Sequence, residues 1–306
     1  MTARLGSLAS MRRLMRAPLI IVCLMYLAAG TCWGKASDAP STVDACKALQ
    51  SIDLSAVADA PTQIVESDFV NARGAIPAYC EVRAYVSPSV GVEVRLPLLR
   101  REPGQRSDWN GKFLQVGCGG LCGTLLSGFF ATACDYPLQK GYACLASDMG
   151  HASGPGDGKW GYNNLQAKVD FAYRATHVAS LAGKAIVQRF YGRAIEKSYF
   201  IGASQGGRQA LVEAQNFPWD FDGIIAGAPA INLTGAMMGL IWTAENLRGP
   251  EGQPALTPAN LQLLYEATLA RCDAVDGLRD GVISDPRSCN FDPSELLCTV
   301  QRRAAA

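Results

Sequence analysis

The segment Gly202–Gly206, with the sequence GASQG, constrains the fold more than any other part of this chain. An apolar run that favours a β-strand precedes it, and a helical pattern follows over Arg208–Asn216. The two glycines carry no Cβ, so a strand and a helix can cross closely while the serine between them occupies a strained turn. We therefore predict a nucleophile elbow with Ser204 as the nucleophile. The alternative is an ordinary glycine-rich turn.

Composition indicates a globular chain. The 306 residues are 49% hydrophobic and 18% charged, which is enough for a sizeable core and excludes wholesale disorder. The formal net charge of +1 gives no electrostatic basis for binding nucleic acid. We expect one large domain or two small ones.

The first 34 residues have the pattern of a secretory signal peptide, with an arginine-rich start followed by an uncharged apolar run over 17–29. That run is shorter than the roughly twenty residues needed to span a bilayer. We expect a mature protein without a membrane segment, secreted to the extracellular space or the periplasm. Nine of the eleven cysteines follow this segment, and such a density suits an oxidising compartment.

Strand-like runs alternate with helical ones up to residue 230, which predicts an α/β core over residues 35–230 with a mostly parallel sheet covered on both faces. After Pro229 a leucine-rich helical run and an Asp/Gly-rich loop predict a separate lobe over 231–306. The expected strands are 91–98 (an edge strand), 112–116, 142–146, 197–201 and 223–227, and the expected helical stretches are 165–190 (one helix, or two abutting near Thr176) and 261–269.

An oxyanion hole can be assigned beside Ser204. The loop Gly117–Gly120 follows a predicted strand upstream of the elbow, where α/β-hydrolases present one backbone donor. We expect the N–H groups of Gly120 and Gln205 to be the two donors, although the glycine pair is also compatible with a tight turn.

The general base is harder to assign. His151 and His177 are the chain's two histidines and both precede Ser204, whereas the α/β-hydrolase order is serine, acid, histidine. His151 follows a strand end, and we expect it to be able to line the cleft. His177 lies within the long helical stretch, and we interpret it as a packed structural residue.

A second cluster of functional side chains lies in the acidic loop 272–285, where aspartates and glycines alternate with apolar residues. Side-chain oxygens of Asp273, Asp276 and Asp280, with backbone carbonyls between them, would suit calcium, which takes six to eight oxygen ligands. The spacing does not fit an EF-hand, because position 12 counted from Asp276 is Arg287. A solvated acidic turn is the alternative.

Taken together, the motifs resemble the tannase and feruloyl esterase family over roughly residues 43–298. The motifs that carry the resemblance are, in order, WNGKF (109–113), GCGG (117–120), SDMGH (147–151), GASQGGR (202–208), FDGIIAGAPA (221–230) and the acidic loop. The resemblance implies an α/β-hydrolase core with a lid inserted after residue 230, and secreted hydrolysis of small esters of aromatic acids.

The resemblance also implies further site residues. A structural calcium ion would be bound by the side chains of Asp273, Asp276 and Asp280 and the carbonyls of Leu278 and Val282. We further expect the disulfides Cys46–Cys80 and Cys272–Cys289, the second of which would close the calcium loop. Pairing among Cys118, Cys122, Cys134 and Cys144 stays open, and Cys298 is expected to have no partner in this chain.

Two departures from the family pattern bear on activity. The family has a cysteine directly before the nucleophile, where this chain has Ala203, and it takes its catalytic Asp and His from a C-terminal part that lies beyond residue 306. We therefore expect a lid domain that is C-terminally truncated and a 306-residue chain that is a poor esterase. The alternatives are a non-catalytic, calcium-stabilised binding domain on a hydrolase scaffold, and a serine peptidase of the same fold.

Overall fold

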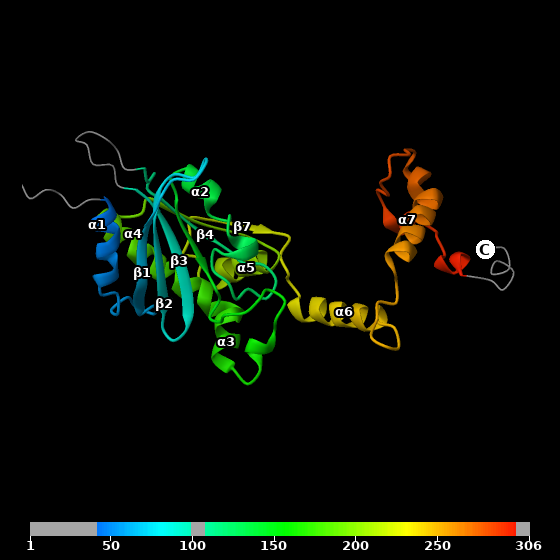
Figure 1. Ribbon diagram of the computed structural model, residues 1–306, viewed down its shortest axis with the longest axis horizontal. Coiled ribbons are helices and arrows are strands. Elements are labelled where there is room, and N and C mark those ends of the chain that lie inside the picture. Colours follow the sequence, from blue (N-terminus) through cyan, green and yellow to red (C-terminus); the bar gives the residue numbers. More distant parts are fainter. Residues whose placement is uncertain (1–41, 99–107, 298–306) are drawn as a thin grey trace, which may run out of the picture. The chain divides into compact units, whose positions relative to one another are not determined.

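The computed structural model describes residues 42–98 and 108–297 (Figure 1). The proposed signal peptide (1–34) and Cys298 lie outside the described residues. Within those residues, no helix is both long and apolar enough to cross a membrane.

A seven-stranded sheet in the order β1-β2-β3-β5-β4-β6-β7 forms the centre of the described part. The strands are β1 (Thr62–Val70), β2 (Tyr79–Val86), β3 (Val90–Pro97), β4 (Lys112–Val116), β5 (Ala143–Ser147), β6 (Lys197–Ala203) and β7 (Gly223–Gly227).

The prediction of a mostly parallel sheet is wrong for its first half. β1, β2, β3 and β5 pair antiparallel in succession, and only β5, β4, β6 and β7 are mutually parallel. The cause is connectivity, because β2 and β3 are joined by a short turn, and a short connection can only return the chain antiparallel. In the parallel half, the carboxyl ends of four strands meet at one edge of the sheet, and the loops that leave this edge carry the candidate site.

The strand expected at residues 91–98 is not an edge strand. It is β3, which lies between β2 and β5, and all of its residues are buried. Its alternating polar positions, Glu93 and Arg95, form a buried ion pair (Arg95 Nη2 to Glu93 Oε1, 3.0 Å) rather than facing solvent. Pro97 is the last residue of the strand, so its missing N–H costs the sheet little.

Helices connect and cover the sheet. They are α1 (Thr42–Ala48), α2 (Asp135–Gln139), α3 (Leu165–Val169), α4 (Ala175–Tyr191), α5 (Gln205–Asn216), α6 (Leu233–Asn246) and α7 (Pro258–Cys272). The stretch expected at 165–190 is α3 and α4 joined by a π-helical turn over Asp170–Arg174, so the irregularity precedes Thr176. α4 packs on β2 to β5, while α5 packs on β6 and β7 (Figure 1).

After residue 230 the described chain is helical and poorly buried. No residue of α6 is buried, and Cys272 is the one buried residue of α7. The change from strands to helices falls where the sequence placed the start of the lobe, and the assignment of 231–306 as a lid stays a prediction.

Four disulfides link the described cysteines. The structure contains Cys46–Cys80 and Cys272–Cys289, the two pairs expected from the resemblance. Two further pairs, Cys118–Cys122 and Cys134–Cys144, resolve the connectivity that the sequence left open.

Candidate active site

Ser204 occupies the junction between β6 and α5, as the sequence predicts. Its backbone has φ 57° and ψ −116°, a conformation that non-glycine residues rarely adopt, and the residue is exposed. The first helical residue after it is Gln205, whose N–H lies in the first turn of α5. The serine hydroxyl is therefore presented beside the positive end of a helix, which is the arrangement of a nucleophile elbow.

Both glycines of the pentapeptide are required by close backbone contacts. A Cβ on Gly202 would lie 2.4 Å from the carbonyl oxygen of Gly206, so the strand and the helix could not cross at their present distance. A Cβ on Gly206 would lie 3.1 Å from the carbonyl oxygen of Cys118. The elbow thus depends on both glycines. Gly206 also allows the loop that follows β4 to pack closely against α5.

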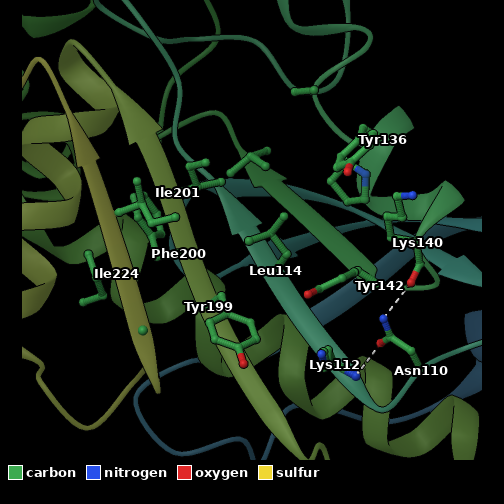
Figure 2. Close-up of a pocket in the computed structure, with 15 residues that line it drawn as sticks. Asn110, Lys112, Leu114, Tyr136, Lys140, Tyr142, Tyr199, Phe200, Ile201 and Ile224 are labelled. Atoms are coloured by element: carbon green, nitrogen blue, oxygen red, sulfur yellow. Dashed lines mark hydrogen bonds between the residues drawn. The ribbon is translucent and has the colours of Figure 1, made fainter.

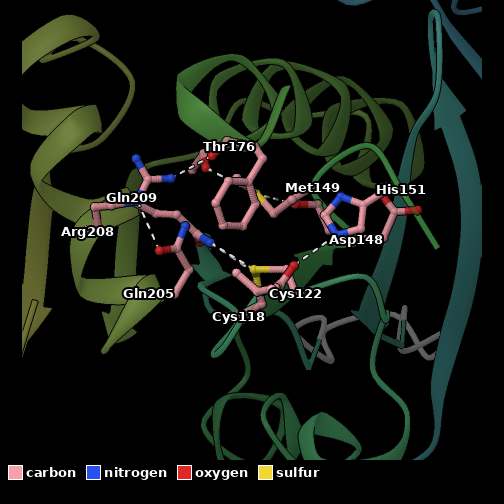
Figure 3. The surroundings of a disulfide bond; sticks show 12 residues. Cys118, Cys122, Asp148, Met149, His151, Thr176, Gln205, Arg208 and Gln209 are labelled. Carbon is pink, nitrogen blue, oxygen red and sulfur yellow. Dashed lines mark hydrogen bonds between the residues drawn. A yellow bond between two sulfur atoms is a disulfide. The ribbon is translucent and has the colours of Figure 1, made fainter. Parts of the chain in front are cut away.

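That loop, Gly117–Gly123, is the expected source of an oxyanion donor. The Cys118–Cys122 disulfide closes it, and Gln209 of α5 donates its side-chain N–H to both sulfurs, at 3.0 Å and 3.4 Å (Figure 3). Gly120 has φ 59°, and an added Cβ there would lie 2.4 Å from the carbonyl oxygen of Pro155. The structure brings the loop against α5, and the pairing of the Gly120 and Gln205 amides as donors stays a prediction.

His151 does not line an open cleft, contrary to the expectation from the sequence. It is 8% exposed, its ring stacks on Trp160 at 3.8 Å, and its Nε2 lies 2.8 Å from the carbonyl oxygen of Leu121. Burial lowers the pKa of His151, so the ring is neutral at pH 7. Through its contact with the Leu121 carbonyl, this histidine supports the Gly117–Gly123 loop.

Asp148 anchors the turn that carries His151. Its Oδ1 accepts the N–H groups of Gly91 (2.9 Å) and Gly150 (2.8 Å), so the carboxylate ties the end of β5 to the start of β3. Burial raises the pKa of Asp148 to about 7, with the two amide hydrogen bonds acting in the opposite direction.

His177 is a packed, partly buried residue, as the sequence indicates. Its ring stacks on Phe217 at 4.0 Å, and its Nδ1 lies 2.6 Å from Asp220 Oδ2. Among residues 42–98 and 108–297, no hydrogen bond to Ser204 Oγ is present, so neither histidine is placed as its base. Sequence reasoning missed Asp220 and its neighbour Glu213.

A signal for part of this polar environment was present in the sequence. Gln205, Gln209 and Glu213 recur every four residues of α5, and all three are buried, at 2%, 3% and 0% exposure. A polar stripe at helical spacing would be expected on the exposed face of a surface helix. Here it lies on the buried face, where Gln209 contacts the Cys118–Cys122 disulfide.

A sizeable cavity among the described residues does not include Ser204. It has a volume of about 910 Å³ and lies over β4, β6 and β7 beside α2 (Figure 2). Tyr136, Tyr142 and Tyr199 line it together with aliphatic side chains of the sheet. This cavity belongs to the sheet face, so we do not assign it to the chemistry at the elbow.

The acidic loop is closed by the Cys272–Cys289 disulfide and is exposed. Asp276 accepts the Ser284 hydroxyl (2.6 Å) and the Leu278 N–H (3.0 Å), and these bonds lower its pKa, so it is ionised at neutral pH. Asp273 Oδ1 and Asp280 Oδ1 accept the backbone N–H groups of Gly281 and Val282. Such an all-oxygen donor set fits a hard cation in its chemistry, and calcium binding stays a prediction.

Comparison with known proteins places this geometry in context. Residues 86–305 match the family described as tannase and feruloyl esterase. Mono(2-hydroxyethyl) terephthalate hydrolase of Piscinibacter sakaiensis is 35% identical over 72% of this chain and 40% of its own length. Probable feruloyl esterase B of Emericella nidulans is 35% identical over 78% of this chain and 41% of its own length.

A solved structure shows the same fold. The crystal structure of feruloyl esterase B from Aspergillus oryzae aligns with a TM-score of 0.64 and 30% sequence identity, covering 85% of this chain and 52% of that one. The present chain therefore spans about two fifths of the length of these curated relatives and about half of the solved one.

Proposed function

The chain belongs to the tannase and feruloyl esterase family, and we propose that it is a carboxylic ester hydrolase that acts through an acyl-enzyme on Ser204. The observation that carries the proposal is the strained, exposed Ser204 at the junction of β6 and α5. A serine held in that conformation costs folding free energy, and such strain is retained where it serves a function.

The reaction begins when Ser204 Oγ attacks the ester carbonyl carbon. The oxygen of that carbonyl becomes an oxyanion, which the N–H groups of Gly120 and Gln205 stabilise in the transition state. The oxyanion collapses, the bond from the acyl carbon to the alcohol oxygen breaks, and the alcohol leaves with the proton that Ser204 gave up. Water then attacks the acyl-serine, which releases the acid and returns a proton to Ser204 Oγ. The base for these steps is assigned neither to His151 nor to His177, because both are engaged elsewhere.

The substrate class follows from the relatives. One is named for feruloyl esters and another for a mono-ester of terephthalate, and both names describe esters of aromatic acids. We propose a small ester of an aromatic acid as the substrate of this chain as well. Export to an oxidising compartment is part of the proposal and is supported by the four disulfides.

Covalent capture tests the proposal. The protein is incubated with a fluorophosphonate and mapped by mass spectrometry, and then assayed on methyl ferulate, methyl gallate and a peptide. We expect one adduct on Ser204, and slow turnover with a preference for the two esters. Absence of an adduct would favour a binding domain on a hydrolase scaffold, and a preference for the peptide would favour a serine peptidase.

We propose calcium as a structural ion of the acidic loop. Metal-free protein is expected to gain about 2.7 kcal/mol of stability when calcium is present at 100 times its Kd. The gain should be lost in Asp276→Asn, which removes a charged oxygen donor, and kept in the control Asp59→Asn on an exposed turn. Thermal melts with and without calcium measure it. An equal gain in Asp276→Asn would place the ion elsewhere.

A further inference from the structure

A second group of titratable side chains is buried at the far end of α5 from Ser204. Glu213 lies in the last turn of this helix and is 0% exposed, and Asp220 lies in the loop between α5 and β7 and is 2% exposed. His177 and Lys184 reach them from α4. Nothing in the proposed ester hydrolysis uses these residues.

Asp220 is surrounded by donors. Its Oδ2 lies 2.6 Å from His177 Nδ1 and accepts the Ser180 hydroxyl at 3.1 Å. Its backbone carbonyl accepts hydrogen bonds from the Lys184 ammonium and the Ser198 hydroxyl. The His177 and Ser180 contacts, which reach the carboxylate itself, favour a negative charge on Asp220.

Glu213 has the opposite environment. Both of its carboxyl oxygens are buried, and neither meets a donor among the described residues. A carboxyl oxygen of Asp220 lies within 4.8 Å of a carboxyl oxygen of Glu213. A carboxylate buried without a donor is costly, and a second carboxylate beside it adds repulsion.

A proton on Glu213 removes both costs. The protonated Glu213 becomes a donor, and its O–H can bond the Asp220 carboxylate. Burial first, and then the Asp220 charge, raise the pKa of Glu213 to about 9, with Lys184 acting in the opposite direction. The ammonium of Lys184 is itself disfavoured by burial, which lowers its pKa against the charges of Asp220, Glu213 and Asp222.

A metal ion is a poorer explanation of this cluster, although ligand atoms of His177, Glu213 and Asp220 lie within 4.8 Å of one another. The 2.6 Å between His177 Nδ1 and Asp220 Oδ2 is a hydrogen-bond distance. Two ligands about 2 Å from a tetrahedral ion would be roughly 3.3 Å apart. The neighbouring Lys184 ammonium would also repel a dication.

We propose that Glu213 is protonated in the folded protein and directs its proton toward Asp220, which in turn links the last turn of α5 to His177 and Ser180 of α4. The inference goes beyond the proposed function and does not depend on it. Because the pKa of Glu213 is about 9 here against an ordinary 4.5, the folded protein binds one more proton than the unfolded chain between these values. Stability from this pair is therefore fully present below about pH 4.5 and is lost as the pH rises through 9.

The substitution Glu213→Gln tests this arrangement, because glutamine keeps the shape and an N–H donor toward Asp220 but does not titrate. Between pH 6 and pH 9, the melting temperature of the wild type is expected to fall by at least about 5 °C more than that of Glu213→Gln. The control Glu251→Gln, at an exposed site, should fall as the wild type does.

A second measurement needs no variant. In wild-type protein with ¹³C-labelled glutamate, one carboxyl resonance is expected to titrate far above the others. An equal pH dependence in the wild type and Glu213→Gln, or glutamate resonances that all titrate near pH 4.5, would overturn the proposal. So would a stoichiometric divalent metal in the wild type that is absent from Glu213→Gln.

Discussion

Ser204→Ala is expected to abolish capture of a fluorophosphonate and to remove all ester hydrolysis above the uncatalysed rate. The hydroxyl is the attacking group, and no neighbouring side chain in the elbow can replace it, because Ala203 and Gln205 flank it. In a serine hydrolase with a complete triad, loss of the serine costs on the order of 10⁶ in turnover. Intact mass after labelling and hydrolysis of methyl ferulate measure the two effects.

The two histidine variants are the matched controls for this prediction. Loss of a general base typically lowers the reaction rate by 10²- to 10⁴-fold. If a histidine served Ser204 as its base, its alanine variant would therefore react with the probe at least 100-fold more slowly. We expect His151→Ala and His177→Ala to capture the probe within about tenfold of the wild type, well short of that range. A 100-fold lower rate of probe capture in His151→Ala alone would identify His151 as an unorthodox base. It would contradict the supporting role that the structure indicates for this residue.

The elbow was predictable because its causes are local. Gly202, Ser204 and Gly206 are neighbours in sequence, and the close crossing that they permit is set by the backbone of the same few residues. The buried β3 was predicted as a strand but placed wrongly at the sheet edge, because its alternating pattern and the proline near its end are typical of edge strands. Its partner elements, β2 and β5, come from other parts of the chain, and no local pattern shows that they will cover both faces.

The remaining differences also come from long-range contacts or irregular backbone. β1 escaped prediction because a register shift between Ile64 and Glu66 interrupts its alternation. β2 was also missed, although buried and more exposed residues alternate along it over 80–86. Glu213 lies on α5 and Asp220 lies in the following loop, and the two side chains meet only in the folded chain. No sequence spacing therefore predicts their contact.

Gly202→Ala is expected to damage the elbow without changing any chemical group in it. The new Cβ would lie 2.4 Å from the Gly206 carbonyl oxygen and 2.7 Å from its Cα, and these are backbone atoms that cannot rotate away. The start of α5 must therefore shift away from β6. Overpacking of this kind costs about 1–3 kcal/mol of stability. A displacement of about 1 Å at a reacting group costs roughly 100-fold in rate.

Two measurements separate this effect from a general loss of folding. Urea unfolding gives the stability change, and the rate of probe capture at Ser204 under folding conditions gives the functional one. Gly156→Ala is the control, because a Cβ there meets nothing within 4 Å and should change neither quantity. We expect Gly202→Ala to capture the probe about 100-fold more slowly than this control while remaining folded. Equal capture rates and equal stabilities in the two variants would show that the crossing of β6 and α5 tolerates a side chain at position 202. Gly202 would then not be what fixes Ser204 in its strained conformation.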